Sequence, residues 1–231
     1  MFGKNKVVGK TYGPHGNGSA QEAAGHGLKV NSIFYTIQGE GPHAGETAVF
    51  VRLTGCNLAC YFCDTEFETG QLMAVDEIAT MVRSKAENTA LVVLTGGEPM
   101  RQQITPLCRL LASTGFVTQI ETAGTVWPVE DTADPELSSL RDLVDLGDVE
   151  LVCSPKTGTV HPLIAACCQH FKYIISVDDV LDDDTGLPVM STQTKGKRER
   201  IYVPDDPSRT IWVQPRYEYH QQPVVDAAKN T

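Results

Sequence analysis

The sequence predicts an α/β fold in which mostly parallel strands form an incomplete, TIM-like barrel. Short apolar runs of strand length alternate along the chain with segments whose apolar residues recur at helical spacing. Polar motifs follow five of the strand segments at the point where each one ends, as at the carboxyl rim of α/β barrels. Seven strand segments within 231 residues are too few for a closed eight-stranded barrel.

The strand and helix segments follow from local apolar patterns. Short apolar runs predict seven strands: Ser32–Thr36, Ala48–Leu53, Ala90–Leu94, Val117–Ile120, Glu150–Cys153, Lys172–Val177 and Thr210–Val213. Apolar residues at spacings of three and four predict three helices: one around Ile78, Met81 and Val82, one from Ile104 to Leu111 that stops at Gly115, and one over Leu163–Cys168. This alternation predicts βα units and a largely parallel sheet.

The chain length fits one domain with a sizeable core. Residues 1–30 are rich in glycine, lysine, asparagine and histidine, and we expect them to form a flexible N-terminal arm. Residues 31–231 form the predicted domain. Its polar stretch near residues 178–200, acidic and then basic, is typical of a solvated insertion. In the polar tail after residue 216, His220 is a candidate site residue by position alone.

Five polar motifs follow five predicted strands. They are Arg52 to Cys63, Thr95 to Pro99, Glu121 to Gly124, Ser154 to Lys156, and Gln214-Pro215. Because parallel strands end at the same edge of a sheet, we expect these motifs to share one rim. Adjacent glycines in the second motif let the backbone approach a ligand closely.

Three cysteines of the first motif stand in a C-x3-C-x2-C pattern: Cys56, Cys60 and Cys63, with the aromatic Phe62 before the last. Thiolate ligands select zinc, copper(I) or an iron–sulfur cluster. Structural zinc takes four protein ligands, and no second cysteine pair has zinc-finger spacing. Three ligands favour a 4Fe-4S cluster with one iron open to another molecule. A non-catalytic, structural zinc-binding module is the alternative.

Cys108, Cys153, Cys167 and Cys168 are scattered, and Cys108, Cys167 and Cys168 fall on apolar helical faces, where we expect them to pack. An odd total of seven cysteines favours a reducing, cytoplasmic location over a disulfide framework.

The formal net charge of -10 argues against direct binding of nucleic acid. The sequence has no apolar run of membrane-spanning length and no apolar stretch near its start, so we expect neither a membrane span nor a signal peptide.

The residues around the cysteines match one family. The cysteine spacing with Phe62 is similar to the signature of the radical S-adenosylmethionine (SAM) superfamily, and Thr95 to Pro99 is similar to its GGEP motif. The stretch YTIQGEG at residues 35–41, Asp64-Thr65 and the SPK at residues 154–156 narrow the match. In this order the motifs make residues 31–177 resemble the 7-carboxy-7-deazaguanine synthases, which implies a radical SAM core, itself a partial barrel.

The resemblance implies the cofactor sites. The three clustered cysteines would hold the 4Fe-4S cluster. Residues expected to bind SAM are Phe62, Cys63, Asp64, Gly97, Glu98, Thr122, Ser154, Pro155, Lys156 and Gln214. Thr65 would ligate Mg²⁺ together with the substrate carboxylate and water.

The implied substrate is a small bicyclic carboxylate, 6-carboxy-5,6,7,8-tetrahydropterin. Its expected binding residues are Ile37, Gln38, Gly39, Arg52 and Thr95. Among them the arginine can make two charge-assisted hydrogen bonds to the carboxylate. Glu40 and Glu121 are the expected catalytic side chains, hydrogen-bonded to the pterin ring.

The implied reaction is a Mg²⁺-dependent radical contraction of the pterin ring to 7-carboxy-7-deazaguanine, with release of ammonia and regeneration of SAM. It needs an electron donor such as flavodoxin or ferredoxin, and the resemblance favours a homodimer. A glycyl-radical activating enzyme is a further alternative, because it would share the cysteines and the GGEP but act on a protein.

Overall fold

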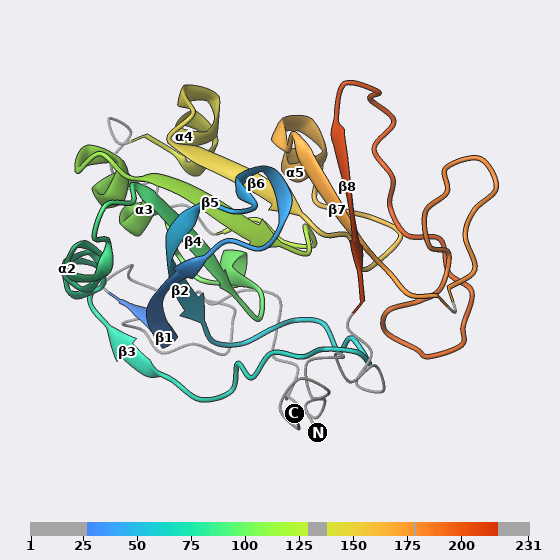
Figure 1. Ribbon diagram of the computed structural model, residues 1–231, viewed down its shortest axis with the longest axis horizontal. Coiled ribbons are helices and arrows are strands. Elements are labelled where there is room, and N and C mark those ends of the chain that lie inside the picture. The colour runs from blue at the N-terminus through green and yellow to red at the C-terminus, as the bar shows by residue number, and fades with distance from the viewer. Residues whose placement is uncertain (1–26, 129–137, 178, 217–231) are drawn as a thin grey trace, which may run out of the picture.

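The computed structural model describes residues 27–128, 138–177 and 179–216, which form a single eight-stranded sheet (Figure 1). The strands lie in the order β3-β1-β2-β4-β5-β6-β7-β8. Their bounds are β1 Leu28–Ile37, β2 Thr47–Leu53, β3 Gln71–Met73, β4 Leu91–Gly96, β5 Val117–Thr122, β6 Val149–Cys153, β7 His170–Ile175 and β8 Thr210–Pro215. From β2 to β8 in this order all pairs are parallel, whereas β1 is antiparallel to β2 and to β3. Since β3 and β8 are the two ends of the sheet, the barrel is open, and the predicted partial barrel is confirmed.

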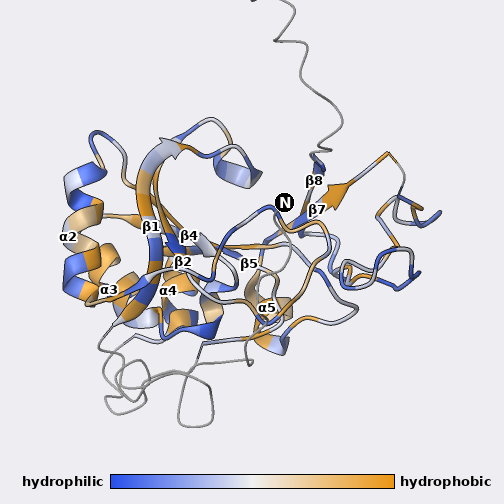
Figure 2. Ribbon diagram, turned by 90° about the horizontal axis from the view of Figure 1, so that it is seen from below, coloured by the Kyte–Doolittle hydropathy of each residue, from blue (hydrophilic) through white to orange (hydrophobic). Residues whose placement is uncertain are grey.

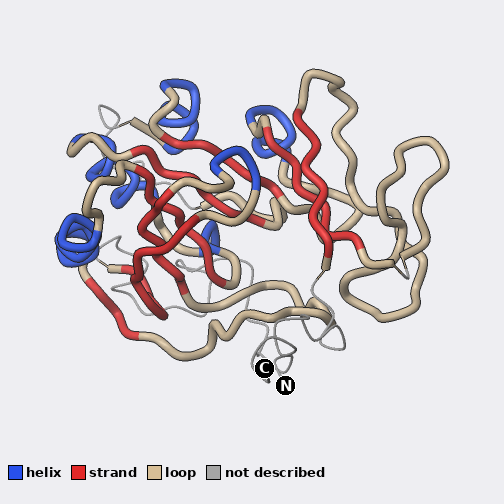
Figure 3. Tube along the Cα trace, in the orientation of Figure 1, coloured by secondary structure: helices blue, strands red, loops and turns tan. Residues whose placement is uncertain are grey.

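Helices cover the outer face of the curved sheet (Figures 1 and 3). They are α2 (Val75–Lys85), α3 (Thr105–Ser113), α4 (Leu140–Leu146) and α5 (Pro162–Cys167), with short 3-10 turns η1 (Gly41–His43) and η2 (Pro99–Arg101). Their apolar sides pack on alternate strand residues to form the main core, which includes Ile78, Leu107 and Ile164. In Figure 2 the turns of α2 alternate between hydrophilic and hydrophobic residues, as expected for a helix with one buried side. None of the helices in the described part of the chain is long and apolar enough to cross a membrane.

The structure departs from the sequence prediction at three places. The count of seven strands was wrong, because the three-residue edge strand β3 adds an eighth. Helix α4 was not predicted, although Ser139 and Asp142 form a capping box at its start and Gly147, with φ of 82°, ends it. The sheet begins at Leu28 rather than at residue 31. The rest of the predicted arm, residues 1–26, and the tail with His220 lie outside the described residues.

Strand register sets which side chains face the open interior. Phe50, Val93 and their neighbours Ala48 and Leu91 form a small apolar cluster separate from the main core. Two residues further along, Arg52 pairs with Thr95 in the ladder between β2 and β4. Because side chains alternate between the two faces of a strand, Arg52 and Thr95 also point into the interior, next to the carboxyl rim.

Two connections lie outside the regular barrel. The β1–β2 hairpin ends in a tip, residues 38–46, that contacts β6, β7 and β8. A long excursion of loops and turns, described at residues 176–177 and 179–209, connects β7 to β8; it is drawn in orange tones in Figure 1 and as loop in Figure 3. Both connections contribute side chains to the site described next.

Candidate active site at the carboxyl rim

The cysteine loop leaves the end of β2. Cys56 is buried, and Cys60 and Cys63 are half-buried. Burial raises the pKa of Cys56 to about 12 and also raises the pKa of Cys63. Two N–H groups point at the sulfurs: the Leu58 backbone donates to Cys56 Sγ at 3.4 Å, and the Gln193 amide donates to Cys60 Sγ at 3.2 Å.

These thiols fit a cluster better than a single metal ion. In the described ranges, no three His, Cys, Asp or Glu side chains are close enough together to hold one ion. A cluster spreads its ligands over several irons, and N–H donors to ligand sulfurs are typical of such sites. The donor set therefore fits a 4Fe-4S group held by Cys56, Cys60 and Cys63, and it disfavours structural zinc.

The glycine strip, Gly96 and Gly97 at the end of β4, lies directly against this loop. Gly97 N donates to Leu53 O at 3.3 Å, and Glu98 N donates to Gly55 O at 2.9 Å. A Cβ on Gly97 would lie 2.2 Å from Gly55 O and 3.0 Å from the Cβ of Cys56. Only glycine allows this approach, so the strip and the cysteine loop form one continuous wall.

The side chain of Glu98 anchors that wall to the neighbouring strand β5. It is fully buried and accepts hydrogen bonds from Thr122 Oγ1 (2.8 Å), Ala123 N (2.8 Å) and Met100 N (3.1 Å). Burial raises its pKa, although these donors oppose the shift. Glu98 and Thr122 are expected at the SAM site; in the structure their side chains bond to each other and tie the end of β4 to the end of β5.

The SPK segment follows β6 on the same rim. Lys156 Nζ donates to Ser154 Oγ and, at 3.1 Å, to Ser154 O, while Pro155 is buried. Burial is the largest influence on Lys156 and lowers the pKa of its ammonium group, against the opposing field of Cys60 and Glu40. The Lys156 amine therefore lies close enough to Cys60 and to Glu40 to interact electrostatically with both.

A second cluster of polar groups lies on the interior face. The Glu121 carboxylate accepts from Thr95 Oγ1 at 2.9 Å and from Gln38 Nε2 at 3.1 Å. Arg52, beside Thr95 in the ladder, lies 5.5 Å from the ring centroid of Phe34 on β1, and its buried Nε has no hydrogen-bond partner among the described residues. This site therefore offers an unsatisfied cationic donor next to an ordered carboxylate.

Glu40, in the hairpin tip, is held by two residues of the last two strands. Lys172 Nζ and Gln214 Nε2 donate to its two carboxylate oxygens. Burial alone would raise the pKa of Glu40, but the Lys172 charge and these hydrogen bonds outweigh it, so the pKa is lowered. Gln214 Oε1 is buried and has no partner in the described part of the chain. Gln214, which the resemblance places at the SAM site, contacts Glu40 in the structure.

Lys172 was missed by sequence analysis. It is 7% exposed and lies in β7 within the apolar run FKYII, where it was assigned only to a strand. A lysine inside such a run is unusual because burying its charge requires a partner, and this was the available signal.

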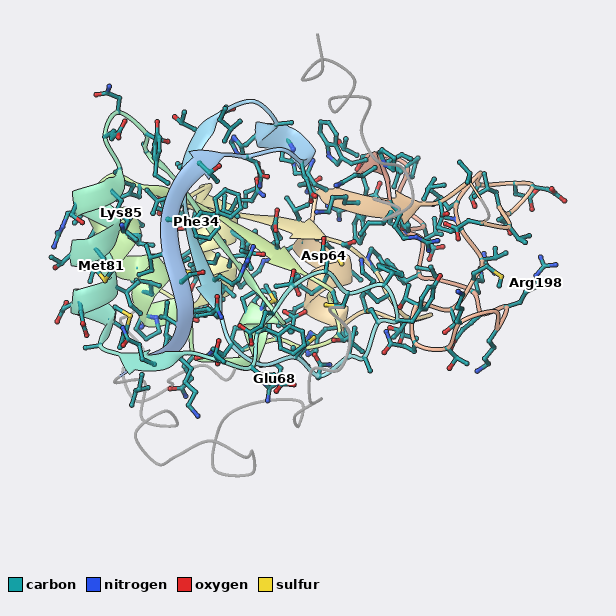
Figure 4. All side chains as sticks on the ribbon, turned by 60° about the horizontal axis from the view of Figure 1, so that its bottom comes forward. Phe34, Asp64, Glu68, Met81, Lys85 and Arg198 are labelled. Carbon is teal, nitrogen blue, oxygen red and sulfur yellow. The ribbon has the colours of Figure 1, made fainter. Side chains whose placement is uncertain are left out.

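Phe62, Asp64 and Thr65, three expected site residues of the cysteine loop, are at least partly exposed to solvent. Asp64 is exposed and accepts a hydrogen bond from Thr65 Oγ1 at 3.0 Å. Phe62 lies under the guanidinium of Arg216, 5.5 Å from the ring centroid. In Figure 4 the labelled Asp64 lies between the strands and the excursion that carries Arg198.

Two expected substrate-binding residues lie at the β1–β2 hairpin. Ile37 is 61% exposed at the end of β1, and Gly39 has open space around it.

The open barrel, the three-cysteine loop and the glycine strip define a class, the radical SAM enzymes. The family model described as Radical SAM superfamily matches residues 50–178, more than half of the chain.

The relatives narrow this class to one family. A 7-carboxy-7-deazaguanine synthase of Rhodospirillum rubrum is 39% identical over 221 residues, which cover 95% of this chain and 83% of the relative. A synthase of the same name from Methanospirillum hungatei is 41% identical over 80% of this chain and 76% of its own length. The chain belongs to the 7-carboxy-7-deazaguanine synthase family.

A solved structure agrees in fold. The crystal structure of QueE from Escherichia coli matches with a TM-score of 0.53 and 23% sequence identity, over 69% of this chain and 76% of that chain. This likeness supports the partial barrel, whereas the family assignment rests on the sequence relatives and the superfamily model.

Proposed function

We propose that this protein converts 6-carboxy-5,6,7,8-tetrahydropterin to 7-carboxy-7-deazaguanine with release of ammonia, as a Mg²⁺-dependent radical SAM lyase. Two neighbouring features of the interior face carry the proposal: Arg52, whose buried Nε lacks a partner among the described residues, and the cluster of Gln38, Thr95 and Glu121. A substrate carboxylate suits the arginine, and a ring edge with both donors and acceptors suits the polar cluster.

The proposed roles follow from these positions. Arg52, stacked on Phe34, binds the substrate carboxylate, because an arginine fork matches its two oxygens. Gln38, Thr95 and Glu121 bind the pterin edge. Glu40, kept ionised by Lys172, holds the tip over the ring and accepts a hydrogen bond from it. Ile37 and Gly39 contribute backbone groups.

The cofactors occupy the rim wall. Cys56, Cys60 and Cys63 hold the 4Fe-4S cluster, and the glycine strip with the SPK segment binds SAM through backbone groups and the Lys156 cation. When bound, the cluster and SAM would together supply radical chemistry for hydrogen-atom removal from the substrate. The protein contributes by orienting the substrate and excluding water from the interior. Thr65 would ligate Mg²⁺ together with the substrate carboxylate.

The assembly and partners are part of the same proposal. The single catalytic domain takes an electron from a carrier protein such as flavodoxin or ferredoxin, works as a homodimer in the cytoplasm, and contacts neither nucleic acid nor membrane. The product enters 7-deazapurine (queuosine or modified DNA base) biosynthesis. The negative net charge supports action on a free small molecule.

The test is anaerobic turnover with SAM, reductant, Mg²⁺ and the carboxytetrahydropterin, with the product identified by mass and ammonia measured. Arg52→Lys should raise the KM for the pterin by about tenfold to a hundredfold, since a bidentate contact becomes a point charge. SAM binding should change little. Arg83→Lys on the exposed side of α2 is the matched control and should behave as the native protein.

Two results would contradict the proposal. A protein with an intact cluster that cleaves SAM yet leaves this pterin unchanged would remove the substrate assignment and leave the superfamily assignment standing. A colourless protein with one tightly bound zinc would remove both.

A further inference from the structure

The excursion between β7 and β8 reaches the cysteine loop. Its residues 190–198 form a small turn, closed by a bridge between Met190 and Arg198 and by a hydrogen bond of 2.7 Å from Ser191 N to Lys197 O. The tip of the turn, residues 194–198, is exposed, as expected of a solvated insertion. At the base of the turn, by contrast, Ser191 and Thr192 are buried.

Gln193 contacts the loop with both ends of its amide. Its Oε1 accepts from Ala59 N at 2.8 Å, and its Nε2 donates to Cys60 Sγ at 3.2 Å. The contacts join residues 133 and 134 positions apart in the sequence.

The orientation of this amide is fixed by its neighbours. The Ala59 N–H can only donate, so the atom facing it must be the amide oxygen. Thr192 Oγ1 donates to Lys156 O at 2.7 Å and must therefore accept from Gln193 Nε2, which lies 2.9 Å away. Both constraints give the same assignment, with the N–H₂ group on the sulfur side.

Backbone contacts hold the same segment in place. Tyr61 N donates to Thr192 O at 3.0 Å, which adds a main-chain link between the turn and the cysteine loop. Thr192 thus joins the cysteine loop to the SPK segment, and Gln193 is anchored on both sides. The Gln193 amide is therefore held in one orientation by the protein.

We propose that Gln193 is a positioning residue of the cluster, which fixes the Cys60 loop and raises the reduction potential of the cluster by its hydrogen bond to Cys60 Sγ. The inference rests on the proposed 4Fe-4S site. Reduction places more negative charge on the sulfurs, so an N–H donor stabilises the reduced state more than the oxidised state. Electron entry is then easier for a given donor protein.

The experiment compares Gln193→Glu and Gln193→Leu in the full-length holoprotein. The glutamate keeps an acceptor for Ala59 N but cannot donate to sulfur; the leucine loses both contacts. Redox titration followed by electron paramagnetic resonance should show a lower midpoint potential in both variants. We expect about a tenfold smaller ratio of reduced to oxidised cluster at a fixed potential, which is about 59 mV for one electron. Gln169→Glu, which adds the same charge at the exposed residue before β7, should leave the midpoint unchanged.

A second readout does not need the cluster. In the cluster-free protein, hydrogen exchange at the Ala59 amide should be about tenfold faster in Gln193→Leu and close to native in Gln193→Glu. Native midpoints in both Gln193 variants, or native Ala59 exchange in the leucine variant, would overturn the inference. Neither readout involves the pterin, so such a failure leaves the substrate assignment untouched, whereas absence of any cluster in the native protein would count against the proposed function itself.

Discussion

The glycine strip after β4 and the hairpin tip at residues 38–46 face the same site, but different interactions hold them. The strip is fixed by main-chain hydrogen bonds to residues 53–55 and by contacts too close for any Cβ. The tip has its own turn hydrogen bonds, yet it is held over the barrel by side chains: Gln38 on Glu121, and Glu40 on Lys172 and Gln214. A change in the strip should therefore disturb the cofactor wall itself, whereas a change behind the tip should alter substrate affinity in an otherwise intact protein.

The largest effect is expected from the cysteines of the wall. Replacing Cys56, Cys60 or Cys63 by alanine should abolish cluster assembly and SAM cleavage, because the three thiols provide the soft ligands. Iron content and the absorption of the purified protein near 400 nm measure the loss. Cys167→Ala is the control: this thiol donates to Leu163 O inside α5. A missing cluster in that variant, with the fold preserved, would overturn the ligand assignment.

Gly97→Ala tests whether the wall tolerates any side chain. The new Cβ would meet the main-chain oxygen of Gly55 at 2.2 Å, so backbone must shift, and we expect a loss of about 1–3 kcal/mol in the free energy of unfolding together with poor SAM binding. Denaturant unfolding and SAM titration measure the two effects. Gly39→Ala in the tip has open space around the new Cβ and should unfold like the native protein. Equal stability of the two variants would contradict the comparison.

Lys172→Met tests the side chains that hold the tip. Without the buried cation the pKa of Glu40 should rise, the tip should loosen, and the KM for the pterin should increase about tenfold or more, with iron content and SAM binding retained. Because the ionised form of Glu40 is lost as the pH falls through its pKa, pterin affinity in this variant should decline at a higher pH than in the native protein. Steady-state kinetics across the acidic range measures both effects.

Two variants accompany this measurement. Lys172→Arg should restore part of the affinity, because it returns the charge. Lys197→Met removes an exposed lysine that faces Glu199 at 3.9 Å and should have no effect. Loss of the cluster in Lys172→Met would show that the tip and the wall are not independent.

Thr65→Ala should have the smallest effect. It removes one proposed oxygen ligand and leaves the substrate carboxylate and waters, so the Mg²⁺ concentration for half-maximal turnover should rise while the maximal rate changes little. Titration of Mg²⁺ at saturating pterin measures this. Thr80→Ala, an exposed threonine whose hydroxyl donates to Asp76 O within α2, is the matched control. An unchanged Mg²⁺ requirement in Thr65→Ala would remove this residue from the metal site.

Much of the site was accessible from the sequence because strand ends are local features. The C-x3-C-x2-C loop, the glycine strip and the SPK segment each follow an apolar run, and parallel pairing from β2 to β8 brings all five motifs to one rim. The roles of the side chains within these motifs were harder to assign. Glu98 and Thr122 stand in cofactor motifs but bond to each other, because a carboxylate buried at a strand end needs donors from the neighbouring strand.

The sequence by itself determined the fold class, the three-cysteine motif and the rim, since periodicity and short motifs depend on neighbouring residues. Only the tertiary structure decided the contacts between distant segments, namely Lys172 on Glu40, Gln38 on Glu121, and Gln193 on the cysteine loop. These pairs are separated by 83 to 133 residues, and a buried lysine or a polar turn has no sequence pattern that names its partner. Burial and hydrogen bonding can select such a pair only after the folded chain has brought its two residues together, so these contacts depend on the tertiary structure.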